Sequence, residues 1–540
     1  MGLKKDKKFK DPIYGYVEIP IEYVNEIIDM AEFQRLRRVV QTSYAPLYSS
    51  AVHNRFVHSI GVFHLGKLAS KQVEGEIIKK FHCDFDISRM CEIFRIACLL
   101  HDVGHAPFSH TGEGFYLDTD KQYTKLHKQL AEIVASETFK NDIPKEKTGC
   151  AAPHEIMSSI VGISSFPQFF SNASEREFFA RCITGYKYTK QCDENGLRNC
   201  FIQLLNSKVI DVDKLDYLIR DSYITGFDTV SIDYERLLSS LTVVKVDGRY
   251  ELAYYKSAIS IIENVVYAHD AERKWIQSHP IVVYETYILQ HIMHHLCEEV
   301  RQLGRDLFCL SSLQAEGMIL KENVKVRLIS DDDIVYLMKN VFSNELSEEY
   351  FSRIDRRHPV WKSEAEYKAI VQSKVGGETL EEFENAMSAT AKYLDRRSDI
   401  WTINQLLIDL IKEDLKKIET QQLDEITKKV QMEDKEKILK VVTCLQKYAK
   451  DVAVDFDFVI IKASQFNSGF GKPDFTDTNI SFVLGHGEEK IAKVDNIVSS
   501  LKPRKTERDD FFYLFYKRGQ GNGARLESQE LCRRLIREFV

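Results

Sequence analysis

Four residues in three separate segments have the side chains and the sequence surroundings expected of metal ligands. His101 and Asp102 are adjacent and follow the apolar helical run Ile96–Leu100. Two polar residues at the end of such a run are costly to bury without a partner, and a divalent cation would supply one. His58 and Asp213 would complete a set of two imidazoles and two carboxylates, which suits Mg, Mn, Fe, Ni or Zn. Such a metal can lower the pKa of a bound water and polarise a phosphoryl oxygen.

Further histidines near these residues are candidates for proton transfer. His105 lies one helical turn beyond His101, close enough to act on a substrate without being a ligand. His110 and the pair His154-Glu155 extend the set, because a histidine tuned near neutral pH can protonate a leaving oxygen.

A second group of side chains suits phosphates. Arg55 offers a fork of donors, Lys214 a point charge and Tyr217 a hydroxyl group. Asp213, Tyr217 and Asp221 are spaced four residues apart, so they share one face of a helix. That face could run from the metal to a sugar.

Each of these residues alone has a simpler interpretation. A lone histidine on an apolar helix is more often a hydrogen-bonded core residue than a ligand, and an Asp-x-Asp pair is often a helix cap. The conjunction of His58, the His101-Asp102 pair and Asp213 favours a metal site over these alternatives.

The segments that carry these residues predict a mainly α-helical protein. Ile87–Leu100 and Gln203–Asp221 have apolar residues three and four positions apart, the spacing of a helix with one buried face. β-Prone runs interrupt the helices, and the Asp247-Gly248 pair between two of them predicts a hairpin turn. We expect strands at Tyr14–Ile19, Leu241–Val246, Tyr250–Tyr254 and Phe456–Ile461.

The chain has 540 residues, a length that predicts two to four cooperating units. We expect a first unit over residues 1–300, a helical extension over 301–450, and a small α+β C-terminal lobe over 451–540. The first unit begins with a basic segment that we interpret as a solubilising tail. Its lysines are Lys4, Lys5, Lys7, Lys8 and Lys10.

Composition excludes several classes of protein. Apolar residues at 44% and charged residues at 29% are typical of a globular protein, and no run of the sequence predicts a membrane span. The first residues lack the apolar stretch of a secretory signal, and the eleven cysteines include no C-x-x-C pair. We therefore expect free thiols and a cytoplasmic location. The net charge of −7 argues against direct nucleic-acid binding.

The candidate residues lie in longer stretches that resemble the HD superfamily, and more closely its branch of deoxynucleoside triphosphate (dNTP) triphosphohydrolases. That branch includes bacterial dGTPases and the animal SAM-and-HD-domain nucleotidase; no SAM domain is expected here. The resemblance covers about residues 8–300, and its ordered set of motifs is far more specific than a bare HD pair. The matching stretches are DPIYGYVEIP at Asp11–Pro20, FQRLRRVVQ at Phe33–Gln41, HNRFVHSIGV at His53–Val62, HDVGHAPFSH at His101–His110, HE at His154-Glu155 and DVDKLDYLIRD at Asp211–Asp221.

The resemblance implies an HD-domain helical core that hydrolyses a dNTP at the α-phosphorus, releasing the deoxynucleoside and intact triphosphate. It implies metal ligation by His58, His101, Asp102 and Asp213. It implies catalytic or phosphate-ordering roles for His105, His110 and His154, with Glu113 or Glu155 supporting an imidazole. Phosphates would contact Arg55, Lys214 and Tyr217, and the deoxyribose would face Gln41, Tyr217 and Asp221.

The resemblance also implies regulation. Asp29, Gln34 and Arg37 match positions that read a guanine nucleotide at a subunit interface in allosteric relatives, which makes these residues candidates for binding a regulatory nucleotide. We favour the alternative that Phe33–Arg37 is an amphipathic helix with solvated surface charges. A homo-oligomer, either dimer or tetramer, is expected.

Two departures from the family pattern limit what it implies about substrate choice. Thr42 follows Gln41 where an apolar residue is common, which puts 2′-deoxy discrimination in doubt. Trp275–Val282 lacks the tyrosine that stacks on the sugar and base in the animal enzyme. Two other functions fit the same metal site: an HD phosphodiesterase acting on a signalling nucleotide, and a nucleotide-sensing regulatory protein.

Overall fold

The structure of the chain is a computed structural model, and it divides into two compact units. Unit 1 comprises Met1–Arg273, Glu299–Leu337 and Asn467–Lys505, and unit 2 comprises Lys274–Glu298, Met338–Phe466 and Thr506–Val540. The structure describes residues 6–117, 122–207, 210–227, 230–322, 324–353, 356–371, 378–395, 400–421, 425–451, 456–464, 480–484, 491–493, 510–518 and 526–539.

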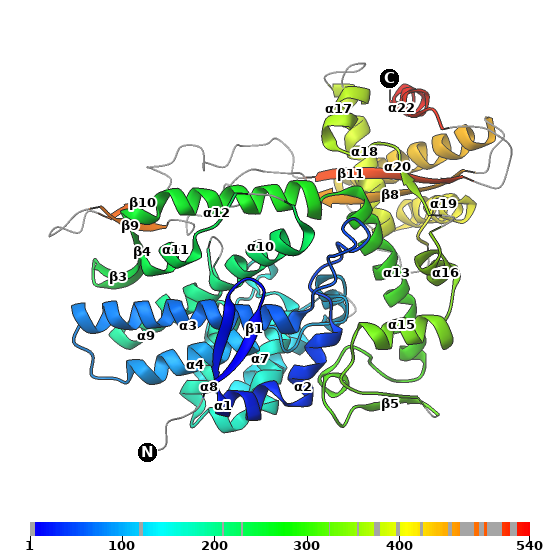
Figure 1. Cartoon of the computed structure of the whole chain (residues 1–540). Coiled ribbons are helices and arrows are strands. Elements are labelled where there is room, and N and C mark those ends of the chain that lie inside the picture. Colours follow the sequence, from blue (N-terminus) through cyan, green and yellow to red (C-terminus); the bar gives the residue numbers. More distant parts are fainter. Residues whose placement is uncertain are drawn as a thin grey trace. The chain divides into compact units, whose positions relative to one another are not determined.

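Unit 1 is built mainly from helices, as predicted, and α3 runs beside α4 at its centre (Figure 1). The core between the helices is apolar and includes the fully buried Phe94, Leu99, Leu100 and Ile160. The helices are α1 (Ile21–Tyr23), α2 (Ala31–Gln34), α3 (Arg55–Lys80), α4 (Ile87–Leu100), α5 (Thr124–Val134), α6 (Glu137–Asp142), α7 (Pro153–Ser165), α8 (Ala173–Thr184), α9 (Asp193–Leu205), α10 (Val212–Thr225), α11 (Tyr234–Ser239), α12 (Ile259–Glu272), α14 (Leu310–Leu313) and the start of α15 (Asp331–Asn340).

Polar caps set where the helices of unit 1 begin. The side chain of Asn54 accepts a hydrogen bond from the amide of Val57 at the start of α3, and Asp86 accepts one from Arg89 at the start of α4. These bonds satisfy amide groups that the helix itself leaves without partners. Helix α4 matches the predicted segment Ile87–Leu100 at both ends.

The predicted helix over Gln203–Asp221 is wrong as a single element. Helix α9 ends at Leu205 and α10 begins at Val212. The physical reason is a helix cap within the run: the carboxylate of Asp211 accepts the amide of Lys214 at 2.7 Å. Apolar spacing continues across the break, so periodicity alone did not reveal it.

Unit 1 also contains small sheets. Strands β1 (Asp6–Asp11) and β2 (Gly15–Pro20) form an antiparallel hairpin, so the described part of the predicted basic tail is a strand, and Lys4 and Lys5 lie outside the described residues. Strands β3 (Leu241–Val246) and β4 (Arg249–Tyr255) confirm the predicted hairpin. Asp247 and Gly248 both have positive φ, as a tight hairpin turn requires. Strand β9 (Ser481–Val483) pairs with β4 in parallel and with β10 (Ile491–Lys493); β5 (Met318–Lys321) pairs with β6 (Val324–Val326).

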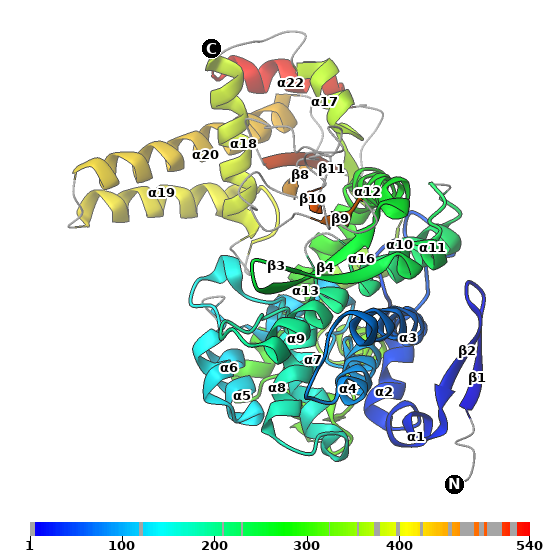
Figure 2. The same ribbon diagram turned by 90° about the vertical axis from the view of Figure 1, so that its left-hand side faces the viewer.

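Unit 2 combines helices with one three-stranded antiparallel sheet of order β7-β11-β8. Helices α19 and α20 form an antiparallel pair (Figure 2). The predicted strand at Phe456–Ile461 is present as part of β8. The elements are α13 (Pro280–Gln302, up to Glu298), α16 (Glu345–Phe351), β7 (His358–Pro359), α17 (Glu364–Val371), α18 (Glu378–Asp395), α19 (Gln405–Thr420), α20 (Glu425–Asp451), β8 (Phe456–Ser464), β11 (Asp510–Arg518) and α22 (Ser528–Arg537).

Two chain-wide observations complete the fold. All eleven cysteines lie within the described residues, and each is a free thiol. Among the described helices, none combines the length and the apolar character needed to cross a membrane.

Candidate metal centre and catalytic cluster

Helix ends in unit 1 bring the four predicted metal ligands together. His58 lies in the first turn of α3, directly after the Asn54 cap. His101 ends α4, with Asp102 next to it, and Asp213 lies in the first turn of α10. Residues separated by up to 155 positions in the sequence therefore meet at one point.

The donor atoms of these residues converge. His58 Nε2 lies 3.2 Å from His101 Nε2, 3.0 Å from Asp213 Oδ1 and 3.6 Å from Asp102 Oδ2. His101 Nε2 lies 3.7 Å from the same Asp213 oxygen and 3.5 Å from Asp102 Oδ1. Ligands that bind one metal at about 2.0–2.2 Å are themselves about 3–3.5 Å apart, so these separations suit a single divalent cation.

The outer nitrogens of the two imidazoles support this interpretation. His101 Nδ1 donates to the carbonyl oxygen of Cys98 at 2.9 Å, and His58 Nδ1 donates to Asp216 Oδ2 at 2.7 Å. With Nδ1 protonated, a neutral imidazole presents the lone pair of Nε2. Two such lone pairs and two carboxylates then face one another, which is an unfavourable arrangement that a cation relieves. The residues therefore fit a divalent metal.

The charges of the site favour a cation as well. Burial would raise the pKa of Asp102, but Arg55 and the two imidazoles hold it well below its usual range. Burial lowers the pKa of His58, but the carboxylates of Asp213, Asp216 and Asp102 outweigh it and raise that pKa to about 9. The same negative potential attracts a metal, which competes with the proton for Nε2.

Asp216 holds His58 in place and was not assigned a role from the sequence. Its oxygens accept hydrogen bonds from Tyr14 Oη at 2.8 Å and from Arg220 at 2.9 and 3.0 Å, besides the bond from His58. Arg220 also donates to Asp11 at 3.0 Å, so the β1–β2 turn is tied to the metal centre. The i, i+4 spacing of Asp216 and Arg220 was the available signal, but such pairs are common on helices.

A second cluster lies beside the metal centre and contains three predicted catalytic histidines. The His105 ring stacks on His154, and His110 lies edge-on to both. His154 Nδ1 donates to Glu113 Oε2, and His110 Nδ1 lies 3.5 Å from Glu113 Oε1. His105 Nε2 is 4.0 Å from Asp102 Oδ1, which joins the two clusters.

The histidines of this cluster differ in protonation. Burial, Arg55 and the neighbouring imidazoles hold the pKa of His105 well below its usual range, so its ring is neutral. Burial also opposes a charge on His154, but Glu113 outweighs it and raises the pKa of His154 to about 9. Donor atoms of His105, His110, Glu113 and His154 are close enough to hold a metal too. We interpret this cluster as one that holds protons, because His154 Nδ1 and Glu113 Oε2 already share one.

The residues predicted to bind phosphate differ in how many hydrogen bonds their side chains already make within the protein. Arg55 donates to Ser109 Oγ at 2.9 Å, to Asp102 Oδ2 at 2.8 Å and to the backbone carbonyl of Gln41 at 3.1 Å. It therefore positions its neighbours, and two of its five N–H groups remain for a substrate.

The other two phosphate candidates lie on α10. Lys214 Nζ donates to Asp211 Oδ2 at 2.5 Å and to the carbonyl of Ser207 at 2.6 Å. Tyr217 Oη makes no hydrogen bond within the described part of the chain, so its hydroxyl group is available to a ligand.

The predicted sugar-binding residues Gln41 and Asp221 are linked by His53. The backbone N–H of Gln41 donates to the backbone carbonyl of His53 at 2.9 Å, and His53 Nε2 lies 2.6 Å from Asp221 Oδ1. Gln41 Oε1 and His53 Nδ1 are buried and have no hydrogen-bond partner among the described residues. No role of His53 was predicted from the sequence, although His53 stands within the matching stretch His53–Val62. In the structure it directly precedes Asn54, which forms an isolated β-bridge with Val40.

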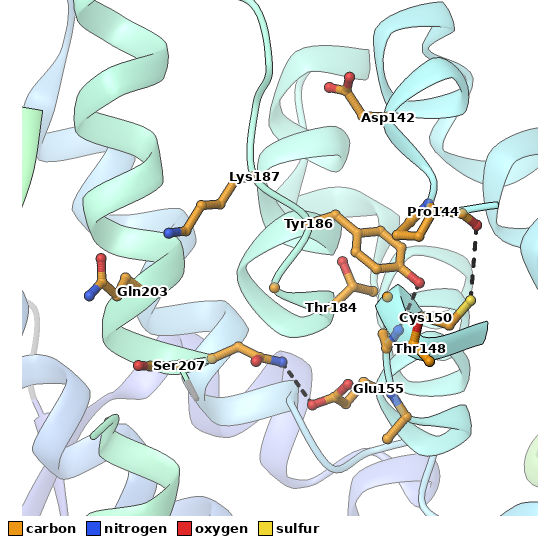
Figure 3. Close-up of a pocket in the computed structure, with 15 residues that line it drawn as sticks. Asp142, Pro144, Thr148, Cys150, Glu155, Thr184, Tyr186, Lys187, Gln203 and Ser207 are labelled. Carbon is orange, nitrogen blue, oxygen red and sulfur yellow. Dashed lines mark hydrogen bonds between the residues drawn. The ribbon is translucent and has the colours of Figure 1, made fainter. Parts of the chain in front are cut away.

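The structure does not bring Glu155 to an imidazole. Its oxygens accept the amide of Ala152 at 2.6 Å and Asn206 Nδ2 at 2.7 Å (Figure 3). Burial raises the pKa of Glu155 to about 7. Of the two carboxylates expected to support a histidine, Glu113 is the one that makes this contact.

Glu155 instead lines a separate cavity of about 390 Å³ (Figure 3). Other lining residues include Lys187 and Tyr186 from the segment after α8, and Asn206 and Ser207 after α9. Of the residues predicted to form the active site, only Glu155 lines this cavity. The cavity is therefore distinct from the histidine cluster.

The predicted regulatory residues lie near the start of unit 1. Gln34 Nε2 donates to the carbonyl of Ile28 at 2.6 Å, and Arg37 Nε donates to Gln34 Oε1 at 2.9 Å. The Arg37 guanidinium also lies over the Phe56 ring, 3.5 Å from its centroid. Asp29 and Arg37 are exposed, and a nucleotide role for the three residues stays a prediction.

Comparisons with known proteins identify one domain of the chain. Residues 55–162 match the HD domain. A protein named deoxynucleoside triphosphate triphosphohydrolase SAMHD1 homolog, from Dictyostelium discoideum, is 30% identical over 279 residues, which are 49% of this chain and 46% of that protein. An uncharacterized protein of Methanocaldococcus jannaschii is 26% identical over 320 residues, 58% of this chain and 56% of the other.

Further matches have the same extent. An uncharacterized protein of Bacillus subtilis, YwfO, is 28% identical over 296 residues, 54% of this chain and 56% of that protein. The chain spans about half the length of the curated relatives it matches. A crystal structure of a hypothetical protein from Aquifex aeolicus matches 99% of both chains with 18% identity and a TM-score of 0.48, too low to support an argument. The chain therefore contains an HD domain over residues 55–162, which includes His58, His101 and Asp102 of the candidate metal centre.

Proposed function

We propose that this protein is a metal-dependent phosphohydrolase that converts a dNTP into a deoxynucleoside and triphosphate. The observation that carries the proposal is the convergence of two imidazoles and two carboxylates beside a cluster of three further histidines. The names of relatives such as the Dictyostelium discoideum protein support dNTPs as the substrate class.

The metal would be held by His58, His101, Asp102 and Asp213. When bound, a divalent cation there supplies a Lewis acid for a phosphoryl oxygen and a lower pKa for a water molecule. Arg55 keeps the Asp102 carboxylate ionised and oriented, and Asp216 does the same for the His58 ring.

The histidine cluster would supply the proton that the reaction requires. Water attacks the α-phosphorus, the bond from phosphorus to the 5′ oxygen breaks, and the departing oxygen takes up a proton. His110 and His154, joined through Glu113, are the source of that proton, because Glu113 keeps His154 protonated at neutral pH. Neutral His105 lies between them and Asp102 and can accept a hydrogen bond from water or phosphate.

The remaining side chains would hold the substrate. Tyr217 and Lys214 face phosphates from α10, and the two unused N–H groups of Arg55 add to them. The unpartnered atoms Gln41 Oε1 and His53 Nδ1 are acceptors that suit sugar hydroxyl groups, with Asp221 next to them. Such buried polar groups discriminate strongly, because a ligand that leaves them unpaired binds poorly.

Regulation is part of the same proposal. We infer a homo-oligomer, dimer or tetramer, in which Asp29, Gln34 and Arg37 bind a regulatory nucleotide. The exposed position of Asp29 and Arg37 supports this inference. Sedimentation with and without GTP or dGTP, compared with an Arg37→Ala variant, tests it; a mass independent of both nucleotide and Arg37 would contradict it.

The central experiment incubates the pure protein with each dNTP and with Mg, Mn, Fe, Ni or Zn in turn, and separates the products. We expect a deoxynucleoside and tripolyphosphate, and loss of both bound metal and turnover in Asp102→Asn. Release of phosphate or pyrophosphate would contradict the proposed reaction.

Two other outcomes would replace the proposal. Hydrolysis of cyclic dinucleotides without dNTP turnover would identify a phosphodiesterase. A His105→Ala variant that binds nucleotide normally and retains every measurable activity would favour a nucleotide-sensing protein.

A further inference from the structure

A short segment beyond residue 300 reaches into the catalytic part of unit 1. Asp331, at the start of α15, is buried, and its two oxygens accept two backbone amides from distant segments. Oδ1 accepts the amide of Phe108 at 2.6 Å, and Oδ2 accepts the amide of Val40 at 2.8 Å. One carboxylate thus joins the segment before Gln41 to the segment that carries the catalytic histidines.

Arg35 makes a matching connection through carbonyl groups. Its buried guanidinium donates to the carbonyl of Ile329 at 2.7 Å, of Val103 at 2.9 Å and of His105 at 2.8 Å. Arg35 therefore links Val103 and His105 to Ile329. On the other side of His105, Phe108 is bonded to Asp331. We call Arg35 and Ile329–Asp331 the brace.

The backbone that the brace holds has an unusual conformation. Phe108 and Ser109 both have a φ of 55°, a left-handed conformation that side chains disfavour. Two consecutive residues of this kind need external bonds to stay in place. The bond from Phe108 to Asp331 is one, and the bond from Ser109 Oγ to the carbonyl of Val40 is another.

Ser109, whose backbone position the brace helps to fix, is linked to the candidate metal centre by hydrogen bonds. Ser109 Oγ accepts Arg55 Nε at 2.9 Å, and Arg55 donates to Asp102 at 2.8 Å. His110, the next residue, belongs to the histidine cluster. The path from Asp331 to Asp102 thus consists of three hydrogen bonds and the peptide bond between Phe108 and Ser109.

We propose that Asp331 and Arg35 are positioning residues of the catalytic site, and that Asp331 sets the geometry of Ser109, Arg55 and His110 from outside the matched HD domain. The bonds require a carboxylate at position 331. An asparagine of the same size has one acceptor oxygen, so its amide group would face one of the two backbone N–H groups. The kinetic consequence of this role rests on the proposed function, whereas the positioning of the backbone does not.

The test compares Asp331→Asn with Asp332→Asn as a matched control. Asp332 is the neighbouring residue, and its side chain is 70% exposed with an ion pair to Arg38 at 3.6 Å. The first readout is hydrogen–deuterium exchange of peptides covering residues 38–42 and 105–110. We expect slow exchange in the wild type and in Asp332→Asn, and faster exchange in both peptides of Asp331→Asn.

The second readout is steady-state hydrolysis of a dNTP. A small misplacement of catalytic groups can cost about 100-fold, so we expect kcat to fall about 10–100-fold in Asp331→Asn with KM changed less. Asp332→Asn should behave as the wild type.

Several results would overturn the inference. Rapid exchange of residues 38–42 and 105–110 in the wild type would do so, and this measurement needs no variant to fold. Wild-type exchange and kcat in Asp331→Asn would also do so, as would a lower melting temperature without any change in kcat per folded molecule. If the wild type hydrolyses no dNTP, the proposed function fails, and the exchange measurement still decides the inference.

Discussion

His105 and His154 stack face to face, with their ring centroids 4.2 Å apart and their planes at 14°. One ring is neutral and the other protonated, because only His154 reaches the Glu113 carboxylate. The protonated ring of His154 can donate a proton, and the neutral ring of His105 has a lone pair that can accept a hydrogen bond. Glu113 therefore keeps His154 protonated, whereas burial and Arg55 keep His105 neutral.

This pair predicts the alkaline limb of the pH profile. Glu113 raises the pKa of His154 to about 9, so the protonated form is lost above that value, and kcat should fall as the pH rises through about 9. Replacing Glu113 by Gln removes the charge that raises the pKa, and the fall should move to lower pH. The measurement is kcat against pH at saturating dNTP and constant metal. A limb that keeps its position in Glu113→Gln would rule out this assignment.

Two glycines of α3 should respond in opposite ways to alanine. A Cβ at Gly61 would lie 1.9 Å from Asp216 Oδ1, whereas a Cβ at Gly75 meets nothing within 4 Å. Overpacking costs about 1–3 kcal/mol, so Gly61→Ala should lower the free energy of unfolding by at least that amount. Gly75→Ala should raise it by about 0.5–1 kcal/mol, since alanine is the better helix former. Urea unfolding of both variants decides the prediction, and equal effects would contradict it.

Asp216 and Tyr14 should govern metal affinity without being ligands. Loss of a group that orients a ligand typically weakens metal binding about 10–100-fold, and we expect that range for Asp216→Asn. Tyr14→Phe removes one hydroxyl donor to Asp216 and should have a smaller effect in the same direction. Tyr16→Phe is the control, because Tyr16 lies on the same hairpin and is exposed. Calorimetric titration of the metal-free proteins with Mn²⁺ measures the difference; identical affinities for Tyr14→Phe and Tyr16→Phe would show that the hairpin does not support the centre.

Glu155 should make the stability of the protein depend on pH. Burial raises its pKa to about 7 in the folded state, above the unfolded value of about 4.3. The folded state therefore binds the proton more tightly, and the contribution of Glu155 to stability is present below about pH 4 and lost as the pH rises through about 7. The loss amounts to about 3–4 kcal/mol.

Glu155→Gln isolates this effect. The variant cannot ionise at position 155, so the difference in unfolding free energy between wild type and variant should change by about 3 kcal/mol from pH 4 to pH 8. A constant offset reflects the altered hydrogen bonds to Ala152 and Asn206, and does not bear on the prediction. A difference that is independent of pH would contradict it.

Much of the helical scaffold could be predicted because its signals are local. The bounds of α4 follow from apolar spacing and the Asp86 cap, and the β3–β4 turn follows from Asp247-Gly248. The break between α9 and α10 could not be predicted from spacing, because Asp211 reads equally well as a helix residue and as a cap. The division of the chain at residues 300 and 450 stays a prediction.

The convergence of the candidate ligands could be predicted from the sequence, whereas the contacts that support them could not. His58, His101, Asp102 and Asp213 stand in segments with their own motifs, and the structure brings them together. Their supporting residues act across large distances in the sequence: His53 meets Asp221, and Asp331 meets Val40. No periodic spacing shows which of these residues meet, so only the folded chain reveals the pairs.

The position of Asp331 in the chain also determines when the site can form during synthesis. A ribosome adds about 5–20 residues per second, so Asp331 follows Asp213, the last of the proposed metal ligands, by about 6–24 seconds. Until then the amides of Val40 and Phe108 lack the carboxylate that accepts them in the finished protein. A nascent chain that already contains every proposed metal ligand therefore still lacks the bonds that align its catalytic loop, and the site matures only after the HD domain itself has been made.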